Sequence, residues 1–259
     1  MECLIDPSAI IDTDTKIGEG VVIGPNSIIG PKVIIGSGVT IGGNCIIDRY
    51  TTIGNGCRIF SHAIIGTEPQ DLKFKGEETY LTIGPNTTIR EFVTINRGTE
   101  GGGGTTRIGE GCFLMAYSHV AHDCQIENHV ILANAATLGG HVHIGDHASI
   151  GGLTAIHQFV NIGEYAFIGG CSAVSMDVPP YVRAVGNRVR IVDVNSIGLE
   201  RKGFSKESIT YIKKAYRYLT LSKMNTSQAL EAIEKNLPPT EEVQKIINFI
   251  RSSKRGICR

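Results

Sequence analysis

The chain has 259 residues, 41% of them hydrophobic, and its 25 Lys and Arg equal its 25 Asp and Glu in number. A net charge of zero argues against a broad nucleic-acid-binding surface. No stretch reaches the roughly 18 consecutive apolar residues of a membrane span, and Met1-Glu2-Cys3-Leu4 lacks the basic start of a secretory signal. We therefore expect a cytoplasmic protein with no nucleic-acid partner and no membrane span.

An aliphatic residue recurs at every sixth position, first from Ile5 to Ile65 and again from Ile108 to Val174. A period of six fits neither an α-helix nor an alternating strand, so it indicates a solenoid repeat. Three hexads would close one triangular coil of a parallel β-helix. The 32 glycines suit such a chain, because we expect its corners to need the positive φ that glycine tolerates.

The seven cysteines show no CxxC spacing, so they predict neither a disulfide framework nor a zinc knuckle. Cys45, Cys57, Cys112 and Cys124 each stand four places after a hexad aliphatic, where other coils carry small residues. We expect these four thiols to be inert core residues.

Two loops interrupt the hexads. Residues 67–76 are polar, and we interpret the eighteen-residue interval from Ile65 to Ile83 as one full coil that leaves the phase unchanged. Residues 96–104 are out of phase and therefore form an insertion. The four glycines of this second loop could bind a phosphate through backbone N–H groups, but no GK[ST] follows, so a flexible loop is the expectation.

The repeat ends at Asp177-Val178-Pro179-Pro180-Tyr181, because the prolines cannot extend a ladder or a helix. We place a β-helix domain at residues 1–186 and a small C-terminal α-helical domain at residues 187–259. Apolar residues at helical spacing, two of the groups behind candidate N-caps at Ser205 and Thr240, predict three helices there. Their apolar faces would contain Ile209, Ile212, Tyr216 and Leu219, then Ala229, Leu230, Ile233 and Leu237, then Val243, Ile246, Ile247 and Ile250.

Positions eighteen apart should lie on adjacent strands, about 4.8 Å from each other. His122 should then lie beside Gly140, and Asp123 beside His141. An imidazole can take a proton from an attacking hydroxyl, and an unobstructed glycine N–H can bind an oxyanion, so the cluster suits acyl transfer. From the pattern alone, His119 is also a candidate base, and the histidines could instead bind a metal or merely lie at turns.

Several motifs together resemble the UDP-N-acetylglucosamine O-acyltransferases, over essentially the whole chain. These motifs are Pro69-Gln70-Asp71-Leu72, His119 to Cys124, Gly139 to Val142, His157-Gln158-Phe159, Asp177 to Tyr181, and Asn195 to Phe204. The resemblance implies a left-handed parallel β-helix that assembles as a homotrimer, with active sites between subunits. It also implies transfer of an (R)-3-hydroxyacyl group from acyl carrier protein to the glucosamine 3-position of UDP-N-acetylglucosamine, the first step of lipid A biosynthesis.

By the same resemblance, His122 would be the general base, Gly140 the oxyanion donor and Asp123 the residue that orients the imidazole. The residues implied to bind substrate are Gln70, Asp71, Lys73, Asn96, His119, His141, His157, Gln158, Asn195, Arg201 and Lys202. Many family members carry histidine where this chain has Asn96, and some carry arginine where it has Lys202. Both departures retain polar donors and bear on substrate preference.

A position matching Gly170 limits acyl-chain length in the family, and glycine there predicts a longer chain of about twelve to fourteen carbons, if each coil of about 4.8 Å spans roughly four methylenes. The other interpretation of Gly170 is a coil corner that needs a positive φ. Acyl carrier protein is acidic, and Lys213, Lys214 and Arg217 are our candidates for docking it. No cofactor and no metal are expected, because the donor is carried on phosphopantetheine.

Two other functions compete with this one. The chain could be another hexapeptide acyltransferase that acts on a 3-amino sugar nucleotide. It could also be a zinc-binding β-helix similar to the γ-carbonic anhydrases, with histidines contributed by neighbouring subunits.

Overall fold

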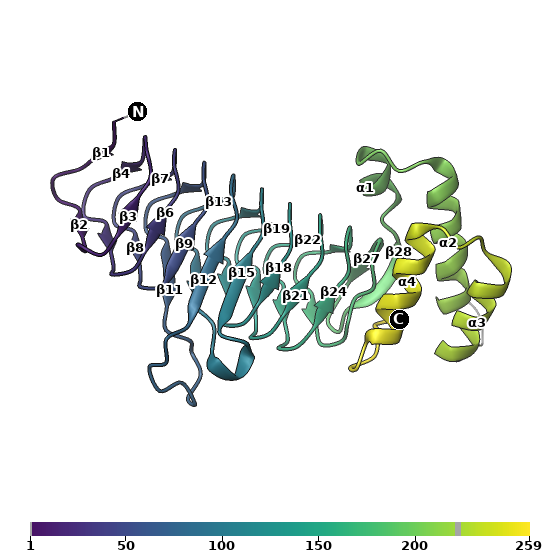
Figure 1. Cartoon of the computed structure of the whole chain (residues 1–259). Coiled ribbons are helices and arrows are strands. Elements are labelled where there is room, and N and C mark those ends of the chain that lie inside the picture. The colour runs from purple at the N-terminus through teal and green to yellow at the C-terminus, as the bar shows by residue number, and fades with distance from the viewer. Residues whose placement is uncertain (1, 221–223) are drawn as a thin grey trace.

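Short parallel strands stack into three flat sheets and form a three-sided β-helix, with a bundle of helices at one end (Figure 1). The structure is a computed structural model and describes residues 2–220 and 224–259. In the regular coils each strand pairs with the strand eighteen residues further on, as Phe113 pairs with Ile131 and Ile131 with Ser149. The predicted eighteen-residue coil is therefore confirmed.

Successive strands along the chain belong to sheet 1, sheet 2 and sheet 3 in turn. Sheet 1 contains β1 (Leu4–Ile5), β4 (Val22–Ile23), β7 (Thr40–Ile41), β10 (Arg58–Ile59), β13 (Thr88–Ile89), β16 (Phe113–Leu114), β19 (Ile131–Leu132), β22 (Ser149–Ile150), β25 (Phe167–Ile168), β27 (Val182–Val185) and β28 (Arg190–Val194). Sheet 2 contains β2 (Ile10–Ile11), β5 (Ile28–Ile29), β8 (Ile46–Ile47), β11 (Ile64–Thr67), β14 (Thr94–Asn96), β17 (His119–Val120), β20 (Thr137–Leu138), β23 (Ala155–Ile156) and β26 (Ala173–Val174). Sheet 3 contains β3 (Lys16–Ile17), β6 (Ile34–Ile35), β9 (Thr51–Ile53), β12 (Tyr80–Ile83), β15 (Thr105–Ile108), β18 (Gln125–Ile126), β21 (His143–Ile144) and β24 (Asn161–Ile162).

The corners between sheets form three long edges, which we name by what they carry. The loop edge joins each sheet 2 strand to the next sheet 3 strand, and both loops leave from it. The α1 edge joins sheet 3 to sheet 1, and the plain edge joins sheet 1 to sheet 2.

The hexad aliphatics point inward and fill the solenoid. Leu114, Val120 and Ile126, one from each sheet, are all buried. The small residues four places later complete the core, and burial raises the pKa of the Cys112 thiol to about 11 and of the Cys124 thiol to about 12. The prediction that these cysteines are buried core residues is confirmed.

Glycine has the expected role at some corners and a second role elsewhere. Gly20, Gly38, Gly56 and Gly111, at corners of the α1 edge, have the predicted positive φ. Many corners place a residue other than glycine at positive φ, as at Asp123, His141 and Phe159 on the loop edge. The glycines that follow hexad aliphatics instead permit close approach of the next coil: a Cβ on Gly151 would lie 2.4 Å from the backbone N of Gly170. Backbone contact between coils, more than positive φ, accounts for these glycines.

Both loops interrupt the coil at the same edge, and Figure 1 shows them projecting side by side. Ile53 pairs with Ile83, thirty residues on, so the first loop replaces a single corner and does not form a full coil. Our interpretation of the interval from Ile65 to Ile83 was wrong, because its length equals one coil only by coincidence. Ile83 pairs with Ile108, twenty-five residues on, which confirms the second insertion.

The C-terminal part contains α1 (Ser196–Arg201), α2 (Lys206–Thr220), α3 (Thr226–Asn236) and α4 (Glu241–Ser252). The last three confirm the predicted helices, and Ser205 and Thr240 accept the expected capping hydrogen bonds from Ser208 N and Val243 N. The sequence did not predict α1. None of the helices in the described part of the chain has the length and hydropathy of a membrane span. The domain boundary at residue 186 stays a prediction; it falls between β27 and β28, which pair with each other.

Helix α2 is tied to the end of the β-helix by Tyr216, whose buried hydroxyl donates to the carbonyl of Pro180 (2.6 Å). We expect Tyr216→Phe to lower the free energy of unfolding by about 1 to 2 kcal/mol, because the Pro180 carbonyl loses its buried partner. Tyr211→Phe on the same helix is the matched control. Its hydroxyl donates to the exposed Glu207, so its loss should change stability by less than about 0.5 kcal/mol in urea unfolding. Equal effects of the two substitutions would contradict this role of Tyr216.

Candidate active site

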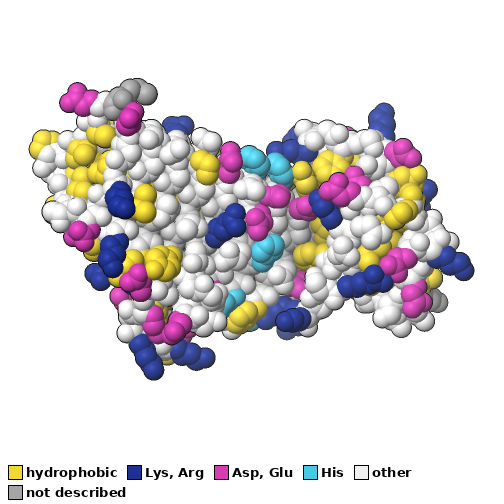
Figure 2. Space-filling model, viewed as in Figure 1, with side chains coloured by type: hydrophobic (Ala, Val, Ile, Leu, Met, Phe, Trp, Pro, Cys, Tyr) yellow, Lys and Arg dark blue, Asp and Glu magenta, His cyan; other side chains and the backbone are white. Residues whose placement is uncertain are grey.

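The ladder brings the candidate residues of three successive coils together on the loop edge. His122 and Asp123 lie between β17 and β18, Gly140 and His141 between β20 and β21, and His157 with Gln158 between β23 and β24. Figure 2 shows histidine side chains at the surface of the β-helix near the helical bundle.

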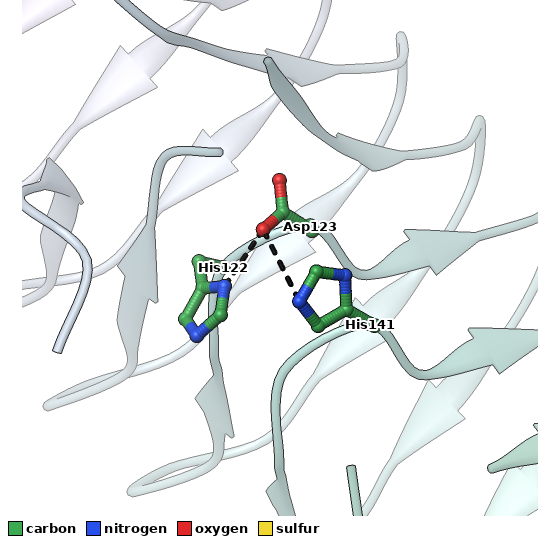
Figure 3. A group of neighbouring side chains, drawn as sticks. All are labelled: His122, Asp123 and His141. Carbon is green, nitrogen blue, oxygen red and sulfur yellow. Dashed lines mark hydrogen bonds and ion pairs between the residues drawn. The ribbon is translucent and has the colours of Figure 1, made fainter. Parts of the chain in front are cut away.

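The centre of the site is a hydrogen-bonded pair, His122 Nδ1 to Asp123 Oδ2 at 2.7 Å (Figure 3). The Asp123 side chain is completely buried, whereas that of His122 is 13% exposed. Asp123 can accept only if Nδ1 of His122 carries the proton, which leaves Nε2 as a proton acceptor. A buried carboxylate therefore fixes both the orientation and the tautomer of the imidazole.

The second loop holds the carboxylate in place. Thr99 donates its N–H to Asp123 Oδ1 (2.8 Å) and its hydroxyl to Oδ2 (2.6 Å), and caps the 3-10 turn Glu100–Gly102. A Cβ on Gly102 would lie 2.0 Å from Asp123 Cγ, so the turn can cover Asp123 only with glycine there. The sequence predicted a flexible loop, but the structure shows it folded over a carboxylate of its own chain. Sequence reasoning missed Thr99.

Gly140 lies directly against the His122 ring, as the eighteen-residue spacing predicted. A Cβ there would be 2.7 Å from Cε1 and 2.8 Å from Nε2 of His122, so any side chain would displace the imidazole. The Gly140 N–H has no acceptor among the residues that the structure describes. It is therefore available to a ligand, and its role as an oxyanion donor stays a prediction.

Two further histidines flank the pair. His141 Nε2 lies 3.7 Å from Asp123 Oδ2, and its ring stacks on Phe159 at 4.4 Å. Burial lowers the pKa of His141, while the charges of Asp123 and Asp71 partly oppose this shift. His119 Nδ1 lies 2.7 Å from Thr94 Oγ1, and burial, then the nearby His122, lowers the pKa of His119. Both flanking rings are therefore biased toward the neutral form.

The first loop, which carries Gln70, Asp71 and Lys73, reaches this site. The charge of Asp71 raises the pKa of His141 against the larger effect of burial, so the first loop contributes to the electrostatics of this corner. Gln70 and Lys73 are exposed.

Asn96 and Arg97 hold the base of this loop. The buried Asn96 amide donates to Thr67 Oγ1 (3.1 Å) and to the Glu68 carbonyl (2.8 Å). The Arg97 guanidinium, 2% exposed, donates to the Gly66 carbonyl and pairs with Asp48 and Glu68. Asn96 thus lies beneath the loop rather than at its surface. The sequence analysis gave Arg97 no role, and the only signal for it was an arginine within a polar insertion.

Other predicted residues lie on different edges of the same chain. The Asn195 amide donates to the carbonyl of Tyr165 on the α1 edge, and the charge of Lys202, after burial, helps to lower the pKa of His147 on that edge. Arg201 is exposed at the end of α1. Gly170 lies on the plain edge between β25 and β26, with φ outside the positive range. One chain does not bring these residues to His122, and a positive φ no longer explains Gly170.

Lys213, Lys214 and Arg217 are exposed on α2. They lie on the helical bundle at the end of the β-helix (Figure 1).

Ligand atoms of His122, Asp123 and His141 lie within 4.8 Å of one another, a spacing that a metal ion could bridge. Two ligands about 2.0 Å from a tetrahedral zinc should be about 3.3 Å apart. The 2.7 Å between His122 Nδ1 and Asp123 Oδ2 is a hydrogen-bond distance instead, and both Asp123 oxygens already accept from Thr99. The geometry fits a histidine–carboxylate pair better than shared metal ligands.

A β-helix of hexapeptide coils with a histidine–carboxylate pair at one corner defines a hexapeptide-repeat transferase. Comparison with family models agrees: residues 105–140 match the bacterial transferase hexapeptide (six repeats), and residues 2–70 match the GMPPB C-terminal domain. Residues 177–258 match domain 2 of UDP-N-acetylglucosamine O-acyltransferase. The chain belongs to the UDP-N-acetylglucosamine O-acyltransferase family.

Full-length relatives support this membership. The chain is 48% identical over 260 residues to the acyl-(acyl-carrier-protein) UDP-N-acetylglucosamine O-acyltransferase of Janthinobacterium sp. (strain Marseille), covering 99% of each chain. Among solved structures, it is similar to the UDP-N-acetylglucosamine acyltransferase of Bacteroides fragilis, with 44% identity, a TM-score of 0.97 and coverage of 99% and 100%. The Campylobacter jejuni enzyme gives 43% identity, a TM-score of 0.93 and 98% coverage of both chains.

The position of the first loop can be tested through His141. Because the Asp71 charge raises the pKa of His141 against the effect of burial, Asp71→Asn should lower that pKa further. Asp123→Asn should lower it more, since Asp123 is the stronger of the two charges. An NMR titration of the His141 ring measures both changes. Glu77→Gln, in the same loop, is the control and should leave the titration unchanged; an unchanged titration in Asp71→Asn would place the first loop away from His141.

Proposed function

We propose that this chain transfers an (R)-3-hydroxyacyl group from acyl carrier protein to the 3-hydroxyl of UDP-N-acetylglucosamine, the first step of lipid A biosynthesis. The observation that carries the proposal is the oriented His122–Asp123 pair beside the bare backbone of Gly140. The relatives named for this reaction support it, because the chain matches them over its whole length. We also propose that the reaction takes place in the cytoplasm and needs no cofactor or metal.

His122 acts as the general base. Its Nε2 accepts the proton of the sugar hydroxyl while that oxygen attacks the thioester carbonyl, and Asp123 stabilises the imidazolium that forms. The carbonyl oxygen becomes an oxyanion and accepts the free N–H of Gly140. When the tetrahedral intermediate collapses, the carbon–sulfur bond breaks and His122 returns its proton to the thiolate of phosphopantetheine.

The sugar nucleotide binds along the loop edge. Gln70, Asp71 and Lys73 contact it from the first loop, and His119, His141, His157 and Gln158 contact it from the coils. Asn195, Arg201 and Lys202 lie on the α1 edge of the same chain, so they reach this substrate from another copy. A homotrimer of three-sided prisms provides that contact and places each active site between subunits.

The 3-hydroxyl is the proposed acceptor, because the relatives that the chain matches are named O-acyltransferases. Asn96, the departure that bears on this choice, is buried and holds the base of the first loop, so it acts on the acceptor through loop position. A 3-amino sugar nucleotide remains the second candidate acceptor. Mass spectrometry of the product made from each sugar nucleotide with a panel of acyl carrier protein thioesters separates the two.

The donor docks through a local basic patch. Acyl carrier protein is acidic and this chain is neutral overall, so Lys213, Lys214 and Arg217 on α2 provide the complementary charge. The acyl chain then runs between subunits past the position of Gly170, where the absence of a side chain admits a longer chain.

Removal of the base should abolish most of the activity. We expect His122→Ala to reduce turnover by about 10² to 10⁴, because the sugar hydroxyl loses its proton acceptor. The fold should persist, since Thr99 still donates two hydrogen bonds to the buried Asp123. His62→Ala, on the plain edge, removes a histidine that stacks on Phe92 and should keep normal turnover. Near-normal turnover of His122→Ala would refute the assignment.

Gly170→Met should shift donor preference by several methylenes toward shorter acyl chains. Each methylene of the acyl chain that is displaced from apolar contact lowers the binding free energy of the donor by roughly 0.8 kcal/mol. A Cβ there would lie 3.1 Å from the carbonyl oxygen of Gly152, so a small backbone adjustment accommodates it. Competition between short and long donors measures the shift, and a thermal melt run in parallel monitors the fold. Equal loss of activity on all donors, with a lower melting temperature, would argue against a length-limiting role.

A further inference from the structure

The chain returns to the loop edge after α4 and is fixed there. Asp177, buried beneath the last coil, accepts from Ser253 Oγ (2.7 Å) at its Oδ2 and from the backbone N of Asn161 (2.7 Å) at its Oδ1. Its own backbone N–H donates to the carbonyl of Gly256 (3.1 Å), and its carbonyl accepts from the N–H of Cys258 (2.9 Å). The segment that follows α4 is therefore anchored on both sides of residues 254 and 255.

This anchoring places two cations beside the active-site corners. Arg255 Nη1 lies 3.1 Å from the carbonyl of Ser175 and 3.2 Å from His157 Nδ1. Lys254 is exposed and makes no ion pair with any residue that the structure describes. Figure 2 shows cationic side chains beside histidine and hydrophobic ones on the lower edge, where the β-helix meets the helical bundle.

The two cations line a cleft of about 680 Å³. The other lining residues are His141, Phe159, Asn161 and Ser252, so no carboxylate is among them. His141 is the ring next to Asp123, and the corner of His157 lies two coils, about 10 Å, from that of His122. The cleft therefore shares His141 with the proposed site and carries two cations.

We propose that Lys254 and Arg255 form a phosphate-binding site at this end of the loop edge. Arg255 has further N–H groups beyond Nη1, and the Lys254 ammonium has three, so both have donors for phosphate oxygens. The proposal rests on the proposed function, since both of its substrates carry phosphate. The sugar nucleotide has a diphosphate, and the pantetheine arm of the donor has a phosphodiester.

The experiment compares Lys254→Gln and Arg255→Gln with the unaltered protein. Calorimetry measures binding of UDP-N-acetylglucosamine, and kinetics compares the same acyl group on phosphopantetheine and on pantetheine without phosphate. If the site binds the diphosphate, each variant should bind the sugar nucleotide about tenfold or more weakly than the unaltered protein. If the site binds the phosphodiester, each variant should instead lose a preference of similar size for the phosphorylated donor.

Lys235→Gln, which removes an exposed lysine of α3, is the control and should change neither measurement. The Arg255 variant could have a lower melting temperature, because the Ser175 carbonyl loses its donor. In that case the Lys254→Gln variant tests the site, since the Lys254 ammonium makes no ion pair with a described residue. Unchanged sugar-nucleotide binding together with unchanged donor preference would overturn the site. If the unaltered protein transfers no acyl group, the proposed function fails, and binding of inorganic pyrophosphate to the protein and to Lys254→Gln still decides the phosphate site.

Discussion

The backbone hydrogen-bond ladder between successive coils is the constraint on which the structure depends. Each coil pairs with the next in a register of eighteen residues, so residues at equivalent corners stack in one line. A strand of two residues contributes little stability alone, but every coil is paired on both sides except at the ends. Glycines such as Gly151 keep the coils close enough for these bonds. Chemistry placed at one corner therefore has fixed neighbours one coil above and below.

The proposed catalytic pair uses this regularity and also departs from it. His122 and Gly140 meet because they occupy equivalent corners. Asp123 needs more, since a completely buried carboxylate requires several hydrogen-bond donors. The second loop supplies them through Thr99, and its glycines let the backbone lie against the carboxylate. An insertion that interrupts the repeat thus stabilises the group that orients the base.

The residues predicted to be functional are divided among three edges, which has a consequence for assembly. His122, His141 and the first loop lie on the loop edge, whereas Asn195 and Lys202 lie near the α1 edge and Gly170 on the plain edge. A rigid prism cannot bring its edges together. If all these residues serve one reaction, symmetric copies must place the α1 edge of one chain near the loop edge of another.

The sequence by itself determined the coil, the direction of the core residues and the meeting of His122 with Gly140. These features depend on a fixed period, and once the period is known, register follows by counting. Counting failed at the first loop, because an interval of eighteen residues fits two structures. It can be one full coil, or it can be a single corner that carries an insertion, as found here. Tertiary structure alone decided that Thr99 holds Asp123 from 24 residues away, that Arg97 reaches Asp48 across 49, and that Arg255 returns to Ser175 across 80. These contacts involve segments outside the repeat. Their partners are buried polar groups that need a hydrogen bond once the chain has folded, and a periodic sequence pattern does not indicate which groups these are.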